Sequence, residues 1–213
     1  MFDCDERGVM TFPDMDGAKR YVFARLEREL PSTLYYHSLA HTRDDVLPAA
    51  TRLARLEGLS GEDQLLLETA AIYHDVGFVE RYRDHEDLGA EIAAQSLPCF
   101  GYNADQIRRI CAVILATVVT TVPRNLLEAV IKDADLDVLG RKDFCASNHR
   151  LLQESRLYVG PVEEGVWVAG QAQFLVEHTY FTRSAQALRD AGKRRNLARL
   201  RAQLDLLREG ASE

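Results

Sequence analysis

The segment TAAIYHDVG, residues 69–77, joins an apolar helical stretch to a histidine, an aspartate and a glycine. The imidazole of His74 and the carboxylate of Asp75 are adjacent, so the two side chains can bind one divalent cation. Polar groups that close an apolar helix need such a partner, because an unpaired charge is unfavourable in a buried position. The alternative is a capped helix end, with Asp75 bonded to nearby backbone donors. Two residues cannot complete a metal site, so further ligands must come from elsewhere in the chain.

Helical periodicity extends along most of the chain, and we find neither strand alternation nor an internal repeat. The pattern predicts helices over residues 16–30, 38–57, 61–76, 86–97, 103–118, 124–139, 142–158, 162–180 and 184–209. The second helix starts at His37 or Ser38, and Pro48 either kinks it or marks its effective start. Gly77 suits the C′ position after the third helix. The expected fold class is therefore all-α, a single compact body of eight or nine helices.

We expect three parts in this body. Residues 1–15 form an N-terminal arm, residues 16–160 form the main domain, and residues 161–213 form helices that pack on the same domain. Nothing between positions 158 and 162 is long enough for a flexible linker. The final helix carries a leucine stripe, which can pack on its own domain or on a second copy of the chain: Leu197, Leu200, Leu204 and Leu207. The sequence therefore does not decide whether the chain forms a homo-oligomer.

The balance of charge argues against two classes of partner. The 213 residues carry a formal net charge of −7, whereas a protein that binds nucleic acid or a membrane surface needs a basic face. The short basic cluster at residues 193–195 is interpreted as a solvated helix face. We therefore expect neither a nucleic-acid polymer nor a membrane as a partner.

Several features favour a cytoplasmic location. The acidic N-terminus lacks the apolar segment of a signal peptide, and no apolar run approaches the roughly 20 residues of a membrane span. No cysteine lies in a C-x-x-C pair, so a zinc ribbon is not expected. The cysteines are scattered, and free thiols fit a reducing cytosol: Cys4, Cys99, Cys111 and Cys145.

Two histidines lie upstream of the central segment, in YYHSLAHT at residues 35–42. If this stretch is helical, His37 and His41 lie one turn apart on one face, with roughly 6 Å between their Cβ atoms. That separation lets one imidazole bind a metal while the other faces a substrate. The alternative is an ordinary pair of histidines on the surface or in the core.

A third group of candidate ligands is the acidic cluster DADLD at residues 133–137. Its helix should bury the apolar stripe Leu127, Val130, Ile131, Ala134 and Val138. On a helical wheel Asp135 falls within this stripe, Asp133 points roughly opposite, and Asp137 lies on the flank. Asp135 is therefore the carboxylate that faces inward and needs a cation. We interpret Asp133 and Asp137 as solvated.

These three segments supply four candidate metal ligands: His41, His74, Asp75 and Asp135. A mixed set of nitrogen and oxygen donors suits Mn²⁺, Fe²⁺, Mg²⁺, Co²⁺ or Zn²⁺ without selecting sharply among them. A cation held in this way lowers the pKa of bound water and polarises a phosphoryl oxygen.

The order His, His-Asp, Asp on an all-helical chain resembles the HD-domain superfamily of metal-dependent phosphohydrolases, over residues 34–142. YHSLAHT (36–42) resembles the superfamily's first-histidine motif, and YHDVG (73–77) resembles its signature. DADLD (133–137) resembles the final motif, in which the second aspartate is the ligand. The resemblance implies an HD-like helical bundle, with a phosphohydrolase domain over residues 16–160. It also implies that the four candidate ligands hold one or two divalent cations.

The same resemblance assigns roles to individual residues. His37 matches the histidine that protonates the leaving oxygen in the phosphodiesterase branch, and Asp75 is expected to be catalytic and can bridge to a second cation. His85 lies where binuclear HD-GYP members supply an extra histidine. Ala116-Thr117, however, stands where the next histidine is expected, and the Gly-Tyr-Pro element is absent. Cyclic-di-nucleotide hydrolysis of that type is therefore not expected, and His85 is interpreted as a second-sphere or phosphate-contacting residue, or as an incidental loop histidine.

A phosphate substrate needs cations nearby. We expect Arg81, Lys132 and Arg141 to bind substrate together with His85, although each basic residue alone could be a surface charge. The predicted function is hydrolysis of a phosphomonoester or phosphodiester bond in a nucleotide or another small phosphorylated metabolite. The alternatives are a non-catalytic metal- or nucleotide-binding signalling module, and a plain helical protein in which the ligand-like residues coincide by chance.

Overall fold

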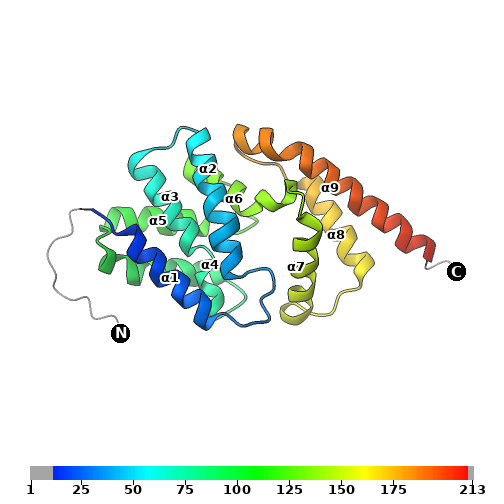
Figure 1. Ribbon diagram of the computed structural model, residues 1–213, viewed down its shortest axis with the longest axis horizontal. Helices are drawn as coiled ribbons and strands as arrows, with labels where there is room; N and C mark the ends of the chain where they lie inside the picture. The colour runs from blue at the N-terminus through cyan, green and yellow to red at the C-terminus, as the bar shows by residue number, and fades with distance from the viewer. Residues whose placement is uncertain (1–11, 211–213) are drawn as a thin grey trace.

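The computed structural model describes residues 12–210, and this part of the chain forms nine α-helices and no strand (Figure 1). The predicted all-α class is confirmed. The predicted N-terminal arm, residues 1–15, lies largely outside the described residues, and α1 already begins at Met15.

The other five of the first six helices surround α3 (Gly61–Tyr73). They are α1 (Met15–Glu29), α2 (Leu47–Leu56), α4 (His85–Ser96), α5 (Ala104–Leu115) and α6 (Leu126–Asp135). Helices α1, α2, α5 and α6 all contact α3, and its residues from Thr69 to Tyr73 are completely buried. Such a central helix is apolar on all sides, which explains why its sequence reads as a nearly continuous apolar run.

The other three helices form a second group: α7 (Phe144–Tyr158), α8 (Glu164–Glu177) and α9 (Arg183–Gly210). Helix α9 lies along α8 and also contacts α2 and the 3-10 turn Leu136–Gly140 that follows α6 (Figure 1). Leu200 of the predicted leucine stripe is buried in this packing. The stripe therefore packs largely within its own chain.

The second helix differs from the prediction at its start. His37 and Ser38 lie in a bend, the helix begins at residue 39, and a π-helical turn, His41–Val46, leads into α2. Pro48 lies in the first turn of α2, as the second of the two alternatives predicted. Proline has no N–H to donate four residues back and its ring crowds the preceding turn, which the wider π turn accommodates.

The cysteines differ from the prediction. Cys111 and Cys145 are free thiols, but Cys99 is disulfide-bonded, so the expectation of free thiols throughout is wrong.

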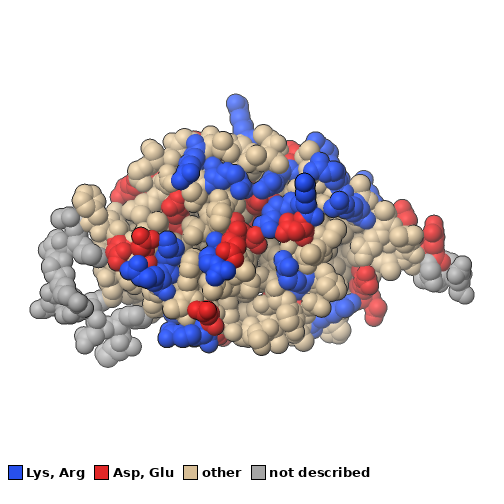
Figure 2. Space-filling view, viewed as in Figure 1, with Lys and Arg blue, Asp and Glu red and all other residues tan. Residues whose placement is uncertain are grey.

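Within residues 12–210 no helix is long and apolar enough to cross a membrane. Figure 2 shows Lys and Arg side chains over α2 and α9 with Asp and Glu among them. In the basic cluster on α9, Lys193 is not simply solvated, because it donates to the backbone carbonyl of His178.

Candidate metal centre

The three predicted segments meet at one point. One ligand atom from each of His41, His74 and Asp135 lies within 4.8 Å of the other two. His41 Nε2 is 3.2 Å from Asp135 Oδ1, and His74 Nε2 is 3.7 Å from the same oxygen. Asp75 Oδ2 lies 3.2 Å from His74 Nε2 and 3.7 Å from His41 Nε2. All four predicted ligands therefore face one small space.

The end of α3 orients His74. The helix ends at Tyr73, and His74 Nδ1 lies 2.8 Å from the carbonyl oxygen of Ala71. This contact makes Nδ1 the protonated nitrogen, so Nε2 presents its lone pair to the other ligands. A helix end that is only capped would not require His74 Nε2 to face the carboxylates of Asp75 and Asp135.

The π turn orients His41. Its widened backbone carries His41 at the first position and Asp45 one turn later, with His41 Nδ1 3.9 Å from Asp45 Oδ2. Asp45 is held in turn by Arg141, which also pairs with Asp143. Single π turns inside helices are frequent at functional sites. Here the turn directs His41 Nε2 toward Asp135.

Gly77 does not act as the predicted C′ residue of α3, but allows two backbone segments to pack closely. Its φ is not among the positive values of the described residues, so it is not a left-handed C′ residue. A Cβ at Gly77 would instead collide with the backbone of His85 and Gly89. This close approach brings the start of α4 against the end of α3, and it places His85 Nε2 3.6 Å from Asp75 Oδ1.

The buried histidines and aspartates of the cluster shift one another's pKa values. Burial by itself lowers the pKa of His41, but the hydrogen bond to Asp135 and the nearby carboxylates raise it to about 10. Burial by itself raises the pKa of the Asp75 carboxyl, but the imidazoles of His74, His37 and His41 hold it well below its usual range. The Asp75 carboxylate is thus ionised, and protonated His41 balances part of the negative charge. A cation competes with such protons for the same atoms.

Two unpaired atoms show that a metal fits this space. His74 Nε2 and Asp75 Oδ2 are buried and make no hydrogen bond within the described part of the chain. A buried polar atom without a partner is unfavourable by about 1–3 kcal/mol, and imidazole nitrogen and carboxylate oxygen are ligands that divalent metals accept. A cation bound by His41, His74, Asp75 and Asp135 would satisfy both atoms.

Comparison with known families agrees with this geometry. A protein-family model, the HD domain, matches residues 35–136, which include all four candidate ligands. This match is consistent with the HD-domain superfamily of metal-dependent phosphohydrolases. No curated protein and no solved structure shows significant similarity to it.

Asp135 faces the two histidines of the HD domain, but the helical wheel was wrong about its neighbours. Asp133 is completely buried, and its carboxylate accepts hydrogen bonds from the backbone N–H groups of Phe181 and Thr182 and from the Thr182 hydroxyl. Asp137 is also buried and pairs with Arg52 and Arg189. The prediction that both are solvated is wrong, because the C-terminal segments cover this side of α6.

Of the four predicted substrate-binding residues, only His85 contacts a candidate ligand. Lys132 is buried, and its ammonium group donates to the backbone carbonyls of Ala116 and Val118. The Arg141 guanidinium is occupied by its two aspartates, and Arg81 is exposed with its Nε bonded to the carbonyl of Asp84. Lys132 and Arg141 therefore have structural partners that the sequence did not indicate.

One residue outside the HD domain contacts the site and was not predicted from the sequence. Glu154 of α7 is completely buried and accepts hydrogen bonds from the backbone N–H groups of Tyr36 and His37. Its other oxygen contacts His37 Nδ1. Burial by itself raises the pKa of Glu154, but the contacts with His37 lower it below its usual value. The sequence around Glu154 gave no local signal of this contact, which joins segments far apart in the chain.

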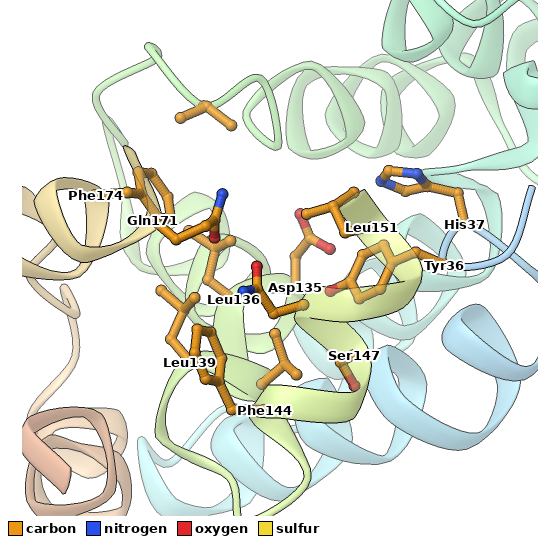
Figure 3. Close-up of a pocket in the computed structure, with 13 residues that line it drawn as sticks. Tyr36, His37, Asp135, Leu136, Leu139, Phe144, Ser147, Leu151, Gln171 and Phe174 are labelled. Carbon is orange, nitrogen blue, oxygen red and sulfur yellow. The ribbon is translucent and has the colours of Figure 1, made fainter. Parts of the chain in front are cut away.

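A cavity of about 300 Å³ opens beside the metal ligands (Figure 3). Asp135 lies in its wall, between Tyr36 and His37 on one side and Gln171 and Phe174 of α8 on the other. The HD domain thus provides the candidate metal centre, and α7 and α8 complete the cavity that adjoins it.

Proposed function

We propose that the protein is a metal-dependent hydrolase of small phosphoesters, with nucleotides as the first candidates among phosphorylated metabolites. The observation that carries the proposal is the convergence of His41, His74, Asp75 and Asp135, with two buried unpaired ligand atoms, at the edge of a cavity of substrate size. A metal of the Mn²⁺, Fe²⁺, Mg²⁺, Co²⁺ or Zn²⁺ type bound there would act as a Lewis acid on a phosphoryl oxygen and acidify water.

His37 is the proposed proton donor to the leaving oxygen. Its ring lines the cavity, and its ring centroid is 6.0 Å from that of His41. Because His37 Nδ1–H donates a hydrogen bond to the Glu154 carboxylate, Nε2 is the nitrogen that is free to exchange a proton with a substrate. The ring is also stacked on Phe78, with 4.4 Å between the ring centroids. Two contacts thus fix the orientation of the group that meets the leaving oxygen.

Tyr36 and Asp75 add a donor and an acceptor at the same site. Burial and the carboxylates of Asp135 and Asp75 raise the pKa of Tyr36 well above its usual value, so its hydroxyl keeps its proton and can donate to a phosphoryl oxygen. A carboxylate that binds a metal keeps further lone pairs, so Asp75 could also accept a hydrogen bond from the attacking water and orient it. His85, 3.6 Å from the other oxygen of Asp75, restrains that carboxylate.

The proposal is tested by turnover of the metal-stripped and reloaded protein on a panel of phosphomonoesters and phosphodiesters. We expect hydrolysis that returns with added metal and falls at least about 1,000-fold in Asp135→Asn, because loss of a metal ligand removes several kcal/mol of transition-state stabilisation. Asp87→Asn, an exposed aspartate on α4, is the matched control and should retain full activity. Equal activity in both variants, or activity that chelation does not reduce, would contradict the proposal.

A further inference from the structure

Helix α8 is more apolar than its burial within the chain explains. Its only charged residues are the first and the last, Glu164 and Glu177. A helix without a charged face is expected to be covered on all sides, yet within residues 12–210 only three of its residues are buried: Val168, Ala172 and Leu175. On the outer face Val166 is 65% exposed and Val176 is 51% exposed. This apolar face has no cover in the described part of the chain.

The leucine stripe of α9 loses its cover toward the C-terminal end. Leu200 is buried, Leu204 is half-buried and Leu207 is 36% exposed. The reason is visible in Figure 1, where the C-terminal end of α9 projects beyond α8. The chain therefore covers the first part of the stripe and leaves its last part apolar and open.

A groove of about 280 Å³ lies between α8 and α9 on this side of the molecule. Its lining includes three residues of α8 and three of α9: Ala169, Gln173, Val176, Arg201, Leu204 and Asp205. The groove is uncharged along α8, and along α9 it carries both a positive and a negative charge. A purely acidic or purely basic partner would meet a like charge there, so the groove favours an occupant that carries both charges.

The outer stripe of α8 is nearly palindromic. Val166 and Val176 stand at its ends, five positions on either side of residue 171, and the uncharged Ala169 and Gln173 stand between them, two positions on either side. A two-fold axis at residue 171 reverses the direction of the helix, so it places each position opposite its counterpart in a second copy. Valine then meets valine, and no charge is buried along a stripe about 15 Å long.

The charges on α9 follow the same symmetry. Arg201 and Asp205 are four positions apart, and an antiparallel second copy presents them in the opposite order. Each arginine then meets the partner's aspartate, at two equivalent contacts. Within the chain, Asp205 Oδ1 lies 3.9 Å from Arg208 Nη1, which is too long for a direct hydrogen bond. The carboxylate can therefore turn to a second partner.

We infer that the chain forms a two-fold symmetric dimer through the outer faces of α8 and α9. The stripe of α8 packs antiparallel on the same stripe of the second copy, and Arg201 pairs with the partner's Asp205. This occupant covers the apolar face of α8, lies at the open end of the leucine stripe and matches both charges. Because α8 also carries Gln171 and Phe174 in the cavity wall, the dimer contact supports the helix that forms this wall. The inference goes beyond the proposed function and does not depend on it.

The first experiment measures the mass of the full chain in solution by sedimentation over a range of concentrations. We expect a species of twice the chain mass of 24.0 kDa. Val176→Glu should raise the dissociation constant of the dimer at least about 10-fold, because it buries a charge without a partner. Val122→Glu is the matched control, because Val122 is 75% exposed and lies outside the groove. Circular dichroism should show that both variants keep their helices.

A monomer at every concentration up to about 100 µM, or equal weakening by both substitutions, would overturn the inference. A mass above that of a dimer would also overturn it, because a two-fold contact closes at two copies.

The second experiment tests the reciprocal charges with two variants, Arg201→Glu and Asp205→Arg. Each variant alone brings like charges together across the two-fold axis, so its dimer should dissociate about 10-fold more readily. A mixture of the two variants should form a heterodimer with nearly the original affinity, because opposite charges again face each other at both contacts. Interactions within one helix cannot produce this recovery on mixing. Single variants that dimerise like the original chain, or a mixture no tighter than the single variants, would overturn the pairing of Arg201 with the partner's Asp205 and the antiparallel arrangement that depends on it.

Discussion

Among single residues, Glu154 and His37 show how a distant side chain can control the chemistry of a site. They are separated by 117 positions in the chain, yet one buried carboxylate binds both the backbone and the ring of His37. Loss of such a partner of a catalytic or ligating histidine typically reduces activity or metal affinity 10–100-fold. Glu154 therefore acts as a positioning residue.

We predict that Glu154→Gln lowers kcat about 10–100-fold and changes KM much less, because the amide keeps the shape of the side chain but removes the charge that holds His37. Steady-state kinetics on a preferred phosphoester measures the changes in kcat and KM separately. Metal content should be unchanged, since Glu154 is not a proposed ligand. Glu91→Gln, an exposed glutamate on α4, is the control. A variant with normal kcat, or one that loses metal, would show that Glu154 does not act through His37.

The candidate ligands were predictable because each carries a local signal. His74 and Asp75 close an apolar helix, and on a helical wheel Asp135 falls within the apolar stripe of the sequence of α6. The position of Asp133 was not predictable in the same way, because a helical wheel assumes one buried face, whereas residues 180–182 cover the opposite side of α6. Glu154 has no local signal at all. Its function depends on a contact between segments that lie far apart in sequence.

Among the helices, the junction of α9 with the turn Leu136–Gly140 depends on two glycines. A Cβ at Gly192 would collide with the backbone of Gly140, and a Cβ at Gly140 would collide with the backbone of Arg189. The two backbones therefore touch directly, and Asn196 strengthens the junction by donating to the carbonyls of Leu139 and Arg141.

We predict that Gly192→Ala lowers the free energy of unfolding by about 1–3 kcal/mol, because the added methyl group overpacks this junction. Chemical denaturation measures the change. The matched control is Gly170→Ala on α8, where a Cβ meets nothing within 4 Å. It should leave stability unchanged or raise it by about 0.4–1 kcal/mol, since alanine favours a helix. Equal effects of the two substitutions would mean that α9 does not pack against the turn as described.

Helix periodicity predicted the number and order of the helices but not their ends. The stretch from His37 to Asp45 is the clearest case, because the sequence suggested a regular helix that begins at His37 or Ser38. The structure has a bend at His37 and a π turn from His41. Both irregularities are fixed by partners from other elements, Glu154 for the bend and Asp135 for the orientation of His41.

For the whole molecule, the proposed metal ligands and the cavity beside them come from different parts of the chain. The HD domain holds the ligands among α2, α3 and α6, while α7 and α8 provide Glu154 and much of the cavity wall. The all-α body was predictable from composition and periodicity. The arrangement of the cavity was not, because it forms where helices distant in sequence meet.

The most direct test of the account is a calorimetric titration of the metal-stripped chain with Mn²⁺, alongside Asp135→Asn and the exposed control Asp87→Asn. We predict stoichiometric binding, one or two ions per chain, in the original chain and the control, and a loss of affinity of at least about 10–100-fold in Asp135→Asn. Circular dichroism should show that all three proteins keep their helices. No binding by the original chain, or equal affinity in all three, would contradict the claim that His41, His74, Asp75 and Asp135 form a metal centre.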